Sequence, residues 1–340
     1  MKRSGLVALL LSAMIIFSLV VVPADEPTLR ISLPPVMGCL PMAFADGWDM
    51  FSEAGLDVEV VGLSDSQARA LALMAGEIDA MICDVSTAIL LVASGTDIVI
   101  TSTAYQPEQT GSLALLTQSY FRIESVDDLL NRTQEGNTLR SIAITERSDI
   151  EYALDSLLTS LGHTVEPDKD YSYWHDMLQL SMFLNLGSVY AAVLPEPYIT
   201  YMCEYPPLKP GASLIHLSDF EGIDILPSVV VLRREMVDQF PDMIAVFYDT
   251  YREVIDEINQ TDRDELMKTG IDIALSLFFP GLTEESVPEG VLDEFDIPHF
   301  SYPTVLSKER FEDVADWLIW KGYTWKHPLY EDVITDRFVK

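Results

Sequence analysis

"GEIDAMICDVSTAILLVASG" (residues 76–95) and "SVYAAVLPEPYITYM" (residues 188–202) are two stretches of one chain that share an outline. Each has a short apolar strand, an acidic residue near the strand's end, and a helix that follows at once. The acidic residues are Asp84 and Glu196. A strand that leads directly into a helix is the unit of a doubly wound α/β sheet. Because this unit recurs, the sequence predicts two such sheets, each with polar turns at the carboxyl ends of its strands.

The first sheet is predicted within residues 28–105. Segments between the strands have helical spacing, so the order of elements is βαβαβαβ, which predicts a parallel sheet with helices on both faces. Apolar or alternating segments predict strands at residues 28–36, 56–63, 78–84 and 97–105.

The same pattern starts again after Gln106 and predicts a second α/β domain. Ser148 and Glu151 have capping-box spacing at the start of a strongly amphipathic helix that Gly162 ends. The apolar segment at residues 225–234 then predicts a strand that carries the chain back into the first domain. Helices are predicted near residues 236–259, 263–278 and 307–321.

The predicted fold class is therefore α/β, with two doubly wound lobes joined by two extended crossovers near residues 98–106 and 222–230. The first lobe is expected to comprise residues 28–104 together with residues 223–340, which include the C-terminal helices. The second lobe is expected to comprise residues 105–222. Ligands of open α/β sheets bind beyond the carboxyl ends of the strands, so the polar turns of both lobes predict a shared cleft.

The N-terminus predicts export. Residues 1–24 begin with a positive Lys2-Arg3 pair, continue with an uncharged apolar run, and end in small residues, which is typical of an export signal. An uncleaved membrane anchor is the alternative. No later stretch is apolar enough to span a bilayer, so we expect a periplasmic or otherwise extracytoplasmic protein. The net charge of −33 excludes nucleic acid as a partner, because phosphate binding requires a basic surface.

Catalytic and metal-binding patterns are absent from the sequence. The five histidines are scattered, and there is no nucleophile elbow and no phosphate-binding glycine loop. The three cysteines are too widely spaced for a zinc motif or a disulfide framework. Cys39 and Cys83 both follow predicted strands, so either a disulfide between them or two separate thiols is open. We expect no catalytic residue, no metal and no cofactor.

Candidate ligand-binding residues lie on or beside the polar turns. Each hydroxyl has an alternative role as the cap of its own helix. Glu196, held between two prolines, could instead be satisfied by local N–H groups, and Trp48 fits an apolar core stripe. The candidates are Cys39, Trp48, Asp84, Ser86, Thr87, Tyr105, Thr145, Arg147, Ser148, Glu196 and Tyr198.

The order and spacing of short motifs resemble the nitrate/taurine/thiamine-precursor class of ABC-transporter substrate-binding proteins. The resemblance rests on "PMAFADGWDMFSEAGLDVEVV", on "ALALMAGEIDAMICDVSTAILLVASG" and on "LNLGSVYAAVLPEPY". The matching positions are Gly47, Gly55, Leu56, Val58, Glu59, Leu73, Ala75, Gly76, Glu77, Asp79, Gly187, Ala191, Ala192, Glu196 and Pro197.

This resemblance implies a type II periplasmic-binding-protein fold that closes its lobes around a small solute and delivers it to ABC permease and ATPase subunits. We expect a monomer. The carboxylates of Asp84 and Glu196 favour a ligand that donates hydrogen bonds, such as an aminopyrimidine thiamine precursor or another nitrogen heterocycle, whereas Arg147 would suit an anion. Two alternatives are an enzyme acting on a small cyclic metabolite and an exported ligand sensor.

Overall fold

The computed structural model describes most of the chain after its N-terminal segment. The predicted export signal lies outside the described residues. None of the helices in the described ranges has the length and apolar character needed to cross a membrane. The described ranges are residues 27–63, 65–107, 112–134, 141–165, 171–204, 209–287 and 289–339.

The first lobe is built on a five-stranded sheet with the order β2–β1–β3–β10–β4. Strand β1 pairs in parallel with β2 and β3, whereas β10 runs antiparallel to both β3 and β4. The strand predicted to return the chain to this lobe is therefore present, as β10. The strands are β1 (Leu29–Ser32), β2 (Val58–Val60), β3 (Ala80–Cys83), β4 (Ile98–Tyr105) and β10 (Ser228–Arg233).

The second lobe repeats this arrangement in the order β7–β6–β8–β5–β9. Strand β6 is parallel to β7 and β8, and β5 is antiparallel to β8 and β9. The sheets are thus mixed, and not wholly parallel as the βαβ pattern predicted. The strands are β5 (Leu113–Gln118), β6 (Ile142–Thr145), β7 (Tyr171–Trp174), β8 (Ala191–Pro195) and β9 (Leu214–Ser218).

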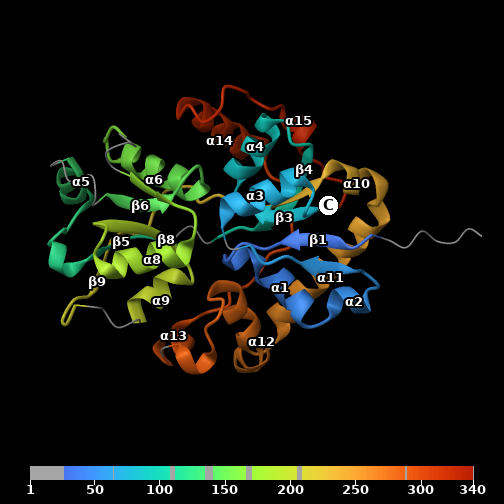
Figure 1. Ribbon diagram of the computed structural model, residues 1–340, viewed down its shortest axis with the longest axis horizontal. Coiled ribbons are helices and arrows are strands. Elements are labelled where there is room, and N and C mark those ends of the chain that lie inside the picture. The colour runs from blue at the N-terminus through green and yellow to red at the C-terminus, as the bar shows by residue number, and fades with distance from the viewer. Residues whose placement is uncertain are drawn as a thin grey trace, which may run out of the picture.

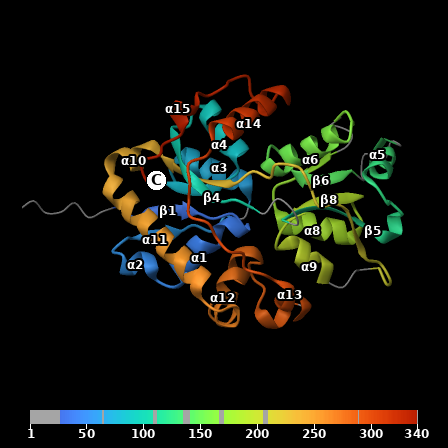
Figure 2. The same cartoon turned by 180° about the vertical axis from the view of Figure 1, so that it is seen from behind.

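The antiparallel strand of each sheet has a topological cause. The chain crosses between the lobes twice, and on each crossing it enters the new lobe at the cleft. Strands β5 and β10 therefore begin at the cleft and run away from it, while the strands that feed helices end there (Figures 1 and 2). The duplicated strand–helix unit and the two-lobed α/β fold class predicted from the sequence are confirmed.

Helices cover both faces of each sheet. The first lobe carries α1 (Leu40–Gly47), α2 (Met50–Glu53), α3 (Ser66–Ala75), α4 (Val85–Ser94), α10 (Arg234–Gln239), α11 (Pro241–Gln260), α14 (Lys308–Trp320) and α15 (Tyr330–Val333), and α12 (Arg263–Phe278) packs on α1. The second carries α5 (Val126–Gln134), α6 (Asp149–Ser160), α8 (Met177–Leu186) and α9 (Tyr198–Glu204), and α13 (Glu289–Glu294) contacts α9.

The predicted amphipathic stripe of α11 forms a large part of the first core. Phe247, Tyr251, Val254 and Ile255 are all buried, and burying each such side chain contributes about 1.5–3 kcal/mol. The hydroxyl of Tyr248 is buried with them and is satisfied by Thr101 and Ser102 on β4. This helix therefore fixes the strand β4 that leads into the first crossover.

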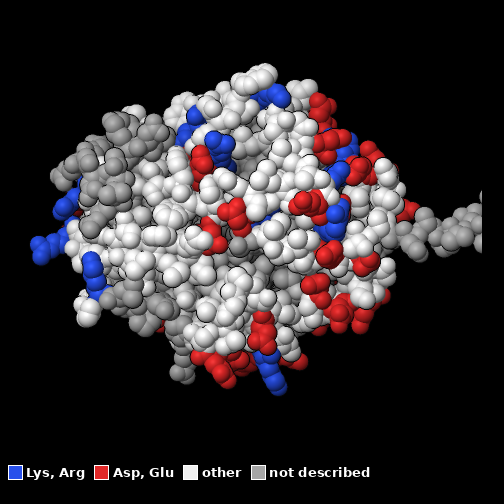
Figure 3. Space-filling model, in the orientation of Figure 1, with Lys and Arg blue, Asp and Glu red and all other residues white. Residues whose placement is uncertain are grey.

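The lobes also contact each other along both sides of the cleft. Helix α14 packs on α4 and lies on the same side of the molecule as α6, whereas α12 and α13 lie at the opposite edge, near α9 (Figure 1). In the view of Figure 3, acidic side chains gather over the outer half of the first lobe, around α2, α10 and α11, and along the edge where α12 and α13 lie.

Candidate functional site

The polar turns of the two lobes meet in a cavity of about 440 Å³. Asp84 ends β3 in the first lobe, and Glu196 follows β8 in the second, so the two acidic residues of the duplicated unit face one space. The two crossovers and residues 296–299, between α13 and α14, close its sides. Its principal polar and aromatic lining residues are Asp84, Tyr105, Ser112, Asp149, Glu196, Ser228, Asp296 and His299.

Asp149 connects the lobes inside this cavity. It is the first residue of α6 in the second lobe, where Ser148 caps the helix by accepting a hydrogen bond from the Glu151 N–H at 3.2 Å. The Asp149 carboxylate reaches the start of α4 in the first lobe. There its two oxygens accept from the N–H groups of Val85 at 2.9 Å and Ser86 at 3.0 Å.

Asp84 returns this contact in the opposite direction. It is the N-cap residue of α4, yet its side chain makes no capping bond to α4. Instead its carboxylate accepts a hydrogen bond from the backbone N–H of Asp149. The N-terminus of each facing helix therefore donates to a carboxylate from the other lobe, in addition to the Ser148 cap of α6.

Burial makes both carboxylates hard to ionise. Burial, followed by the negative charge of Asp84, raises the pKa of Asp149 to about 7, although the hydrogen bonds from Ser86 and Val85 act against the shift. Burial also raises the pKa of Asp84, against the opposing charge of Arg69 and the bond from Asp149. Like charges close together disfavour double ionisation, so the pair holds a proton more tightly than isolated aspartates do.

Glu196 combines both roles that the sequence left open. Its carboxylate caps α9, because it accepts from the Thr200 N–H and from the Thr200 hydroxyl, both at 3.2 Å. It also lines the cavity, where burial raises its pKa. Among the described residues that line this cavity there is no Lys or Arg, so its polar groups are mainly hydrogen-bond acceptors.

Tyr105 is the aromatic candidate that lines the cavity. It ends β4, and its ring lies 5.4 Å from that of Phe300. Trp48 lies elsewhere, with its ring stacked on Phe44 at 4.7 Å, so it belongs to the core stripe. Tyr198 is fully buried and donates a hydrogen bond from its hydroxyl to the carbonyl of Phe278 at 3.1 Å.

The remaining candidates support the cavity or lie outside it. Ser86 is fully buried behind Asp149, and Thr87 is half-buried one residue further along α4. The Thr145 hydroxyl bonds to that of Ser148 at 2.9 Å, within the turn before α6. Cys39 is fully buried in the short helix η1 (Met37–Cys39).

Arg147 points away from the cavity. Its guanidinium lies over the ring of Tyr323, 5.1 Å from the ring centroid, and its Nε is 3.4 Å from Glu146. The described cysteines are all free: Cys39 and Cys83 are buried and Cys203 is exposed, so the separate-thiol alternative holds. Within the described ranges no group of three or more His, Cys, Asp and Glu side chains is arranged to hold a metal ion.

Five of these principal lining residues were missing from the predicted set, and one of them, Ser112, directly precedes β5. Asp149 carried a usable signal, because it directly follows the N-cap Ser148 on a turn that was expected to face the cleft. Ser228 begins the returning strand β10. Asp296 and His299 lie between α13 and α14, where the sequence has no strand–helix pattern to point at the cleft.

A second cavity of about 650 Å³ lies beside the first, across the β1–η1 segment. It is lined by the loops after β1 and β2, by the start of α8 and by α12, and its acidic residues are Asp46, Asp176 and Asp272. Tyr198 contributes to its wall. The smaller cavity brings together three of the predicted residues and two helix N-termini, so it is the better candidate site.

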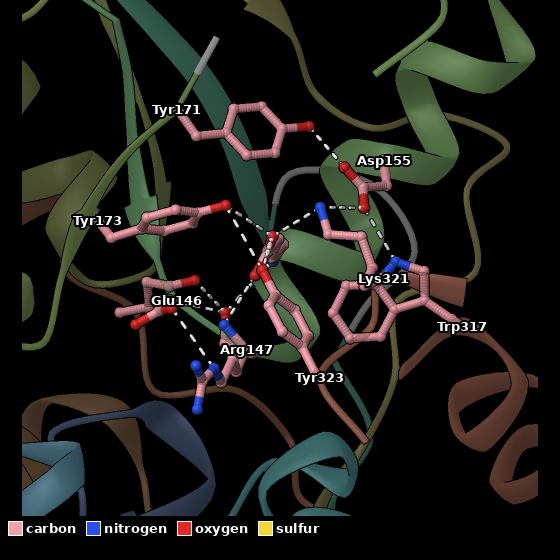
Figure 4. Close-up of polar contacts among 11 residues, drawn as sticks. Glu146, Arg147, Asp155, Tyr171, Tyr173, Trp317, Lys321 and Tyr323 are labelled. Atoms are coloured by element: carbon pink, nitrogen blue, oxygen red, sulfur yellow. Dashed lines mark hydrogen bonds and ion pairs between the residues drawn. The ribbon is translucent and has the colours of Figure 1, made fainter. Parts of the chain in front are cut away.

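A buried ion cluster forms another contact between the lobes, around Lys321 at the end of α14. Its Nζ lies 2.7 Å from Glu151 and 2.9 Å from Asp155, both on α6, and all three side chains are at most 4% exposed. Four aromatic side chains surround the ammonium (Figure 4). Each donates a hydrogen bond to one of the carboxylates; they are Tyr171, Tyr173, Trp317 and Tyr323.

These features define a class: two-lobed α/β proteins of the periplasmic-binding-protein fold, with a polar cavity between the lobes. No protein-family model and no curated protein matches the chain by sequence. Solved structures match it well in three dimensions, and among them are substrate-binding proteins of ABC import systems. The fold is therefore the one that the sequence resemblance implied.

Three of these structures are informative. The alkanesulfonate-binding protein of Xanthomonas axonopodis pv. citri, bound to MOPS, has a TM-score of 0.71 at 15% identity over 92% of this chain and 99% of its own. The zinc-bound ligand-binding component of an ABC-type import system from Staphylococcus aureus scores 0.69 at 14%, covering 92% and 98%. The nitrate-binding protein of Synechocystis PCC 6803 scores 0.66 at 11%, covering 92% and 86%.

Proposed function

We propose that this chain is the extracytoplasmic solute-binding component of an ABC importer and that it binds its ligand without altering it. The observation that carries the proposal is the 440 Å³ cavity between two lobes, at the N-termini of α4 and α6. The fold shared with ABC substrate-binding proteins supports it. The partners would be a permease and an ATPase, and the protein would act as a monomer.

The lining of the cavity favours a ligand that donates hydrogen bonds. Asp84 and Glu196 present carboxylate oxygens from opposite lobes, and no cationic side chain from the described residues lines the space between them. Both carboxylates already accept hydrogen bonds from protein groups, and a ligand amine or ring N–H would supply further donors to them from the cavity. We therefore propose a nitrogen heterocycle or another amine-bearing metabolite, with Tyr105 stacking against it.

Closure would follow from the position of these groups. Lobe one, residues 28–104 with 223–340, and lobe two, residues 105–222, would rotate about the two crossovers. Each lobe supplies part of the ligand's hydrogen-bond partners, so only the closed state satisfies the ligand fully. Hinge closure of such proteins is a known mode of conformational change. Excluding water then strengthens the polar contacts inside the cavity.

A ligand screen tests this function. The purified chain is incubated with cytosine, 4-amino-5-hydroxymethyl-2-methylpyrimidine, nitrate and methanesulfonate, and its melting temperature is compared with that in buffer. We expect an aminopyrimidine to raise the melting temperature and to be recovered unchanged. Stabilisation by the anions alone would contradict the ligand class, and a chemically altered pyrimidine would show an enzyme instead.

A substitution locates the ligand. Replacing Glu196 by Gln removes a charged acceptor while preserving the shape of the side chain, so the affinity for the ligand should fall by about tenfold or more. Glu204→Gln, at the exposed end of the same helix α9, is the matched control and should leave the affinity unchanged. Equal affinities for the wild type and Glu196→Gln would remove Glu196 from the binding site.

A further inference from the structure

The N-terminus of α4 binds a carboxylate from the chain itself, that of Asp149. The first two N–H groups of this ten-residue helix point at the Asp149 carboxylate, which accepts from both through separate oxygens at 2.9 and 3.0 Å. Helix N-termini bind carboxylate, phosphate or sulfate in this way, because free N–H groups and the helix dipole both favour negative charge. The position that an external anion would take beside the cavity is therefore filled.

The origin of this carboxylate is unusual for a helix cap. The residue next to α4 that would normally supply the cap, Asp84, makes no bond to the helix and turns to the Asp149 backbone. The N–H groups of Val85 and Ser86 thus depend on a side chain from the other lobe. That side chain also lines the cavity, so it stands between the helix and whatever the cavity holds.

We propose that Asp149 is the residue that determines ligand charge: it occupies the anion-binding position at the start of α4 and thereby excludes sulfonates, carboxylates and nitrate from the cavity. An anion could reach the two N–H groups only by displacing a carboxylate that already makes both bonds. It would also meet the carboxyl groups of Asp84, Glu196 and Asp296 on the same cavity wall, which accept hydrogen bonds and do not attract an anion. A neutral or cationic ligand encounters neither obstacle.

This inference rests on the proposed function in one respect, namely that the cavity is the solute site. Its physical content is independent of the natural ligand, because it concerns two backbone N–H groups and one side chain. Removing the Asp149 side chain should convert a site that rejects anions into one that accepts them. The solved alkanesulfonate- and nitrate-binding proteins show that proteins of this fold do take such ligands.

The test is a titration with sodium methanesulfonate, followed by calorimetry at constant ionic strength. We expect no saturable binding to the wild type, and at least about tenfold tighter binding to Asp149→Ala, because two helix N–H groups become free and one negative charge is lost. Asp242→Ala removes the same charge from the exposed first turn of α11 and should behave like the wild type. Saturable binding to the wild type, or no gain in Asp149→Ala, would overturn the inference.

A second variant keeps the test decisive if Asp149→Ala unfolds. Asp149→Asn preserves the size of the side chain and one acceptor oxygen but removes the charge, so it should bind methanesulfonate more tightly than the wild type, with a gain smaller than the roughly tenfold expected for Asp149→Ala. Identical behaviour of Asp149→Asn and the wild type would contradict the proposal. The proposed function is judged separately. If the wild type binds an aminopyrimidine, the function is supported even when neither variant binds methanesulfonate. If a variant gains methanesulfonate binding, the inference about Asp149 is supported even when no pyrimidine binds.

Discussion

Helix α6 contacts the first lobe in two ways that differ in how their charges are compensated. Around Lys321, one ammonium meets two carboxylates, Glu151 and Asp155, and four aromatic donors complete their hydrogen bonding. At the N-terminus of the same helix, Asp149 and Asp84 face each other with backbone N–H groups as their main donors. The first cluster is closed to solvent on every side, and the second borders the cavity.

The two contacts therefore have different roles: the Lys321 cluster holds the lobes together, and the Asp84/Asp149 pair responds to a ligand. A buried ion cluster with every partner in place has no spare acceptor for a ligand, so its role is to fix α6 on α14. The carboxylate pair has raised pKa values and acceptors on the cavity side, so its energy changes when a proton or a donor-bearing ligand arrives. We expect substitutions to affect mainly stability at the first contact and mainly pH dependence and ligand choice at the second.

The largest expected effect comes from breaking the Lys321 cluster. Lys321→Met leaves Glu151 and Asp155 buried without their cation, which should lower the free energy of unfolding by about 3–5 kcal/mol. Denaturant unfolding followed by fluorescence measures this loss.

Lys308→Met provides the control on the same helix. Lys308 begins α14 and pairs with Glu331 and Glu312 at the surface, where water replaces the contacts, so its loss should leave stability nearly unchanged. If the two variants unfold at the same denaturant concentration, the cluster does not hold the lobes together.

The next effect is the pH dependence of the carboxylate pair. Burial raises the pKa of Asp149 in the folded state from 3.8 to about 7, so the folded protein binds this proton more tightly than the unfolded chain. Its contribution to stability is therefore complete below about pH 4 and is lost as the pH rises to about 7. Asp149→Asn should flatten the decline in stability across this range.

The control for this experiment is Asp242→Asn, which removes a charge from an exposed first turn and should keep the full decline. Denaturation midpoints measured between pH 4 and pH 8 give the three profiles. A decline of equal size in Asp149→Asn and the wild type would show that other acids with raised pKa values, such as Asp46 and Glu196, control the pH dependence.

Much of the fold could be predicted because its signals are local. Strand length, apolar periodicity and helix caps located the sheets and the turns that contain Asp84 and Glu196. Local signals can also conflict. One helix was predicted near residues 236–259, but the structure has two, α10 and α11, which meet at Phe240. Pro241 starts the second helix, although the apolar stripe continues. The cap of α3 is Asp65, which accepts from the Ala68 N–H at 2.8 Å.

The contacts between the lobes were beyond prediction for a different reason. The Lys321 cluster joins three segments that are remote in sequence, α6, β7 and the end of α14, and no periodicity relates them. The bond from Asp149 to α4 depends on how closely the lobes approach. Arg147 was expected to suit an anion, but its guanidinium lies over the ring of Tyr323, and its backbone has a positive φ of 56° at the turn before α6, which the sequence does not signal.

A third contact between the lobes contains no charged group, so it serves as a reference for the Lys321 cluster and the Asp84/Asp149 pair. Tyr198 of the second lobe donates to the carbonyl of Phe278 on α12. Tyr198→Phe should cost about 1 kcal/mol of stability, equally at every pH, and should leave ligand affinity unchanged. Thermal unfolding at two pH values and a ligand titration measure these effects. A change in affinity would instead place the Tyr198 hydroxyl at the ligand.

The smallest expected effect is on thiol reactivity, and it reports on the first lobe beside the carboxylate pair. Cys203 is exposed and should react with a neutral thiol reagent at once, while the buried Cys39 and Cys83 should react slowly. In Cys203→Ser, the slow rate then reports how often the first lobe opens around its two buried thiols, Cys39 and Cys83, the second of which directly precedes Asp84.

The pH dependence of this slow rate links the thiols to the comparison. If ionisation of Asp149 weakens the contact between the lobes, the reaction rate of Cys203→Ser should rise between pH 6 and pH 8. The rise should be larger than in Cys203→Ser/Asp149→Asn, because both proteins share the increase in thiolate with pH. In Cys203→Ser/Lys321→Met the rate should be faster at every pH, because the buried carboxylates of Glu151 and Asp155 have lost their cation. Equal pH profiles with and without Asp149 would mean that the pair does not control opening.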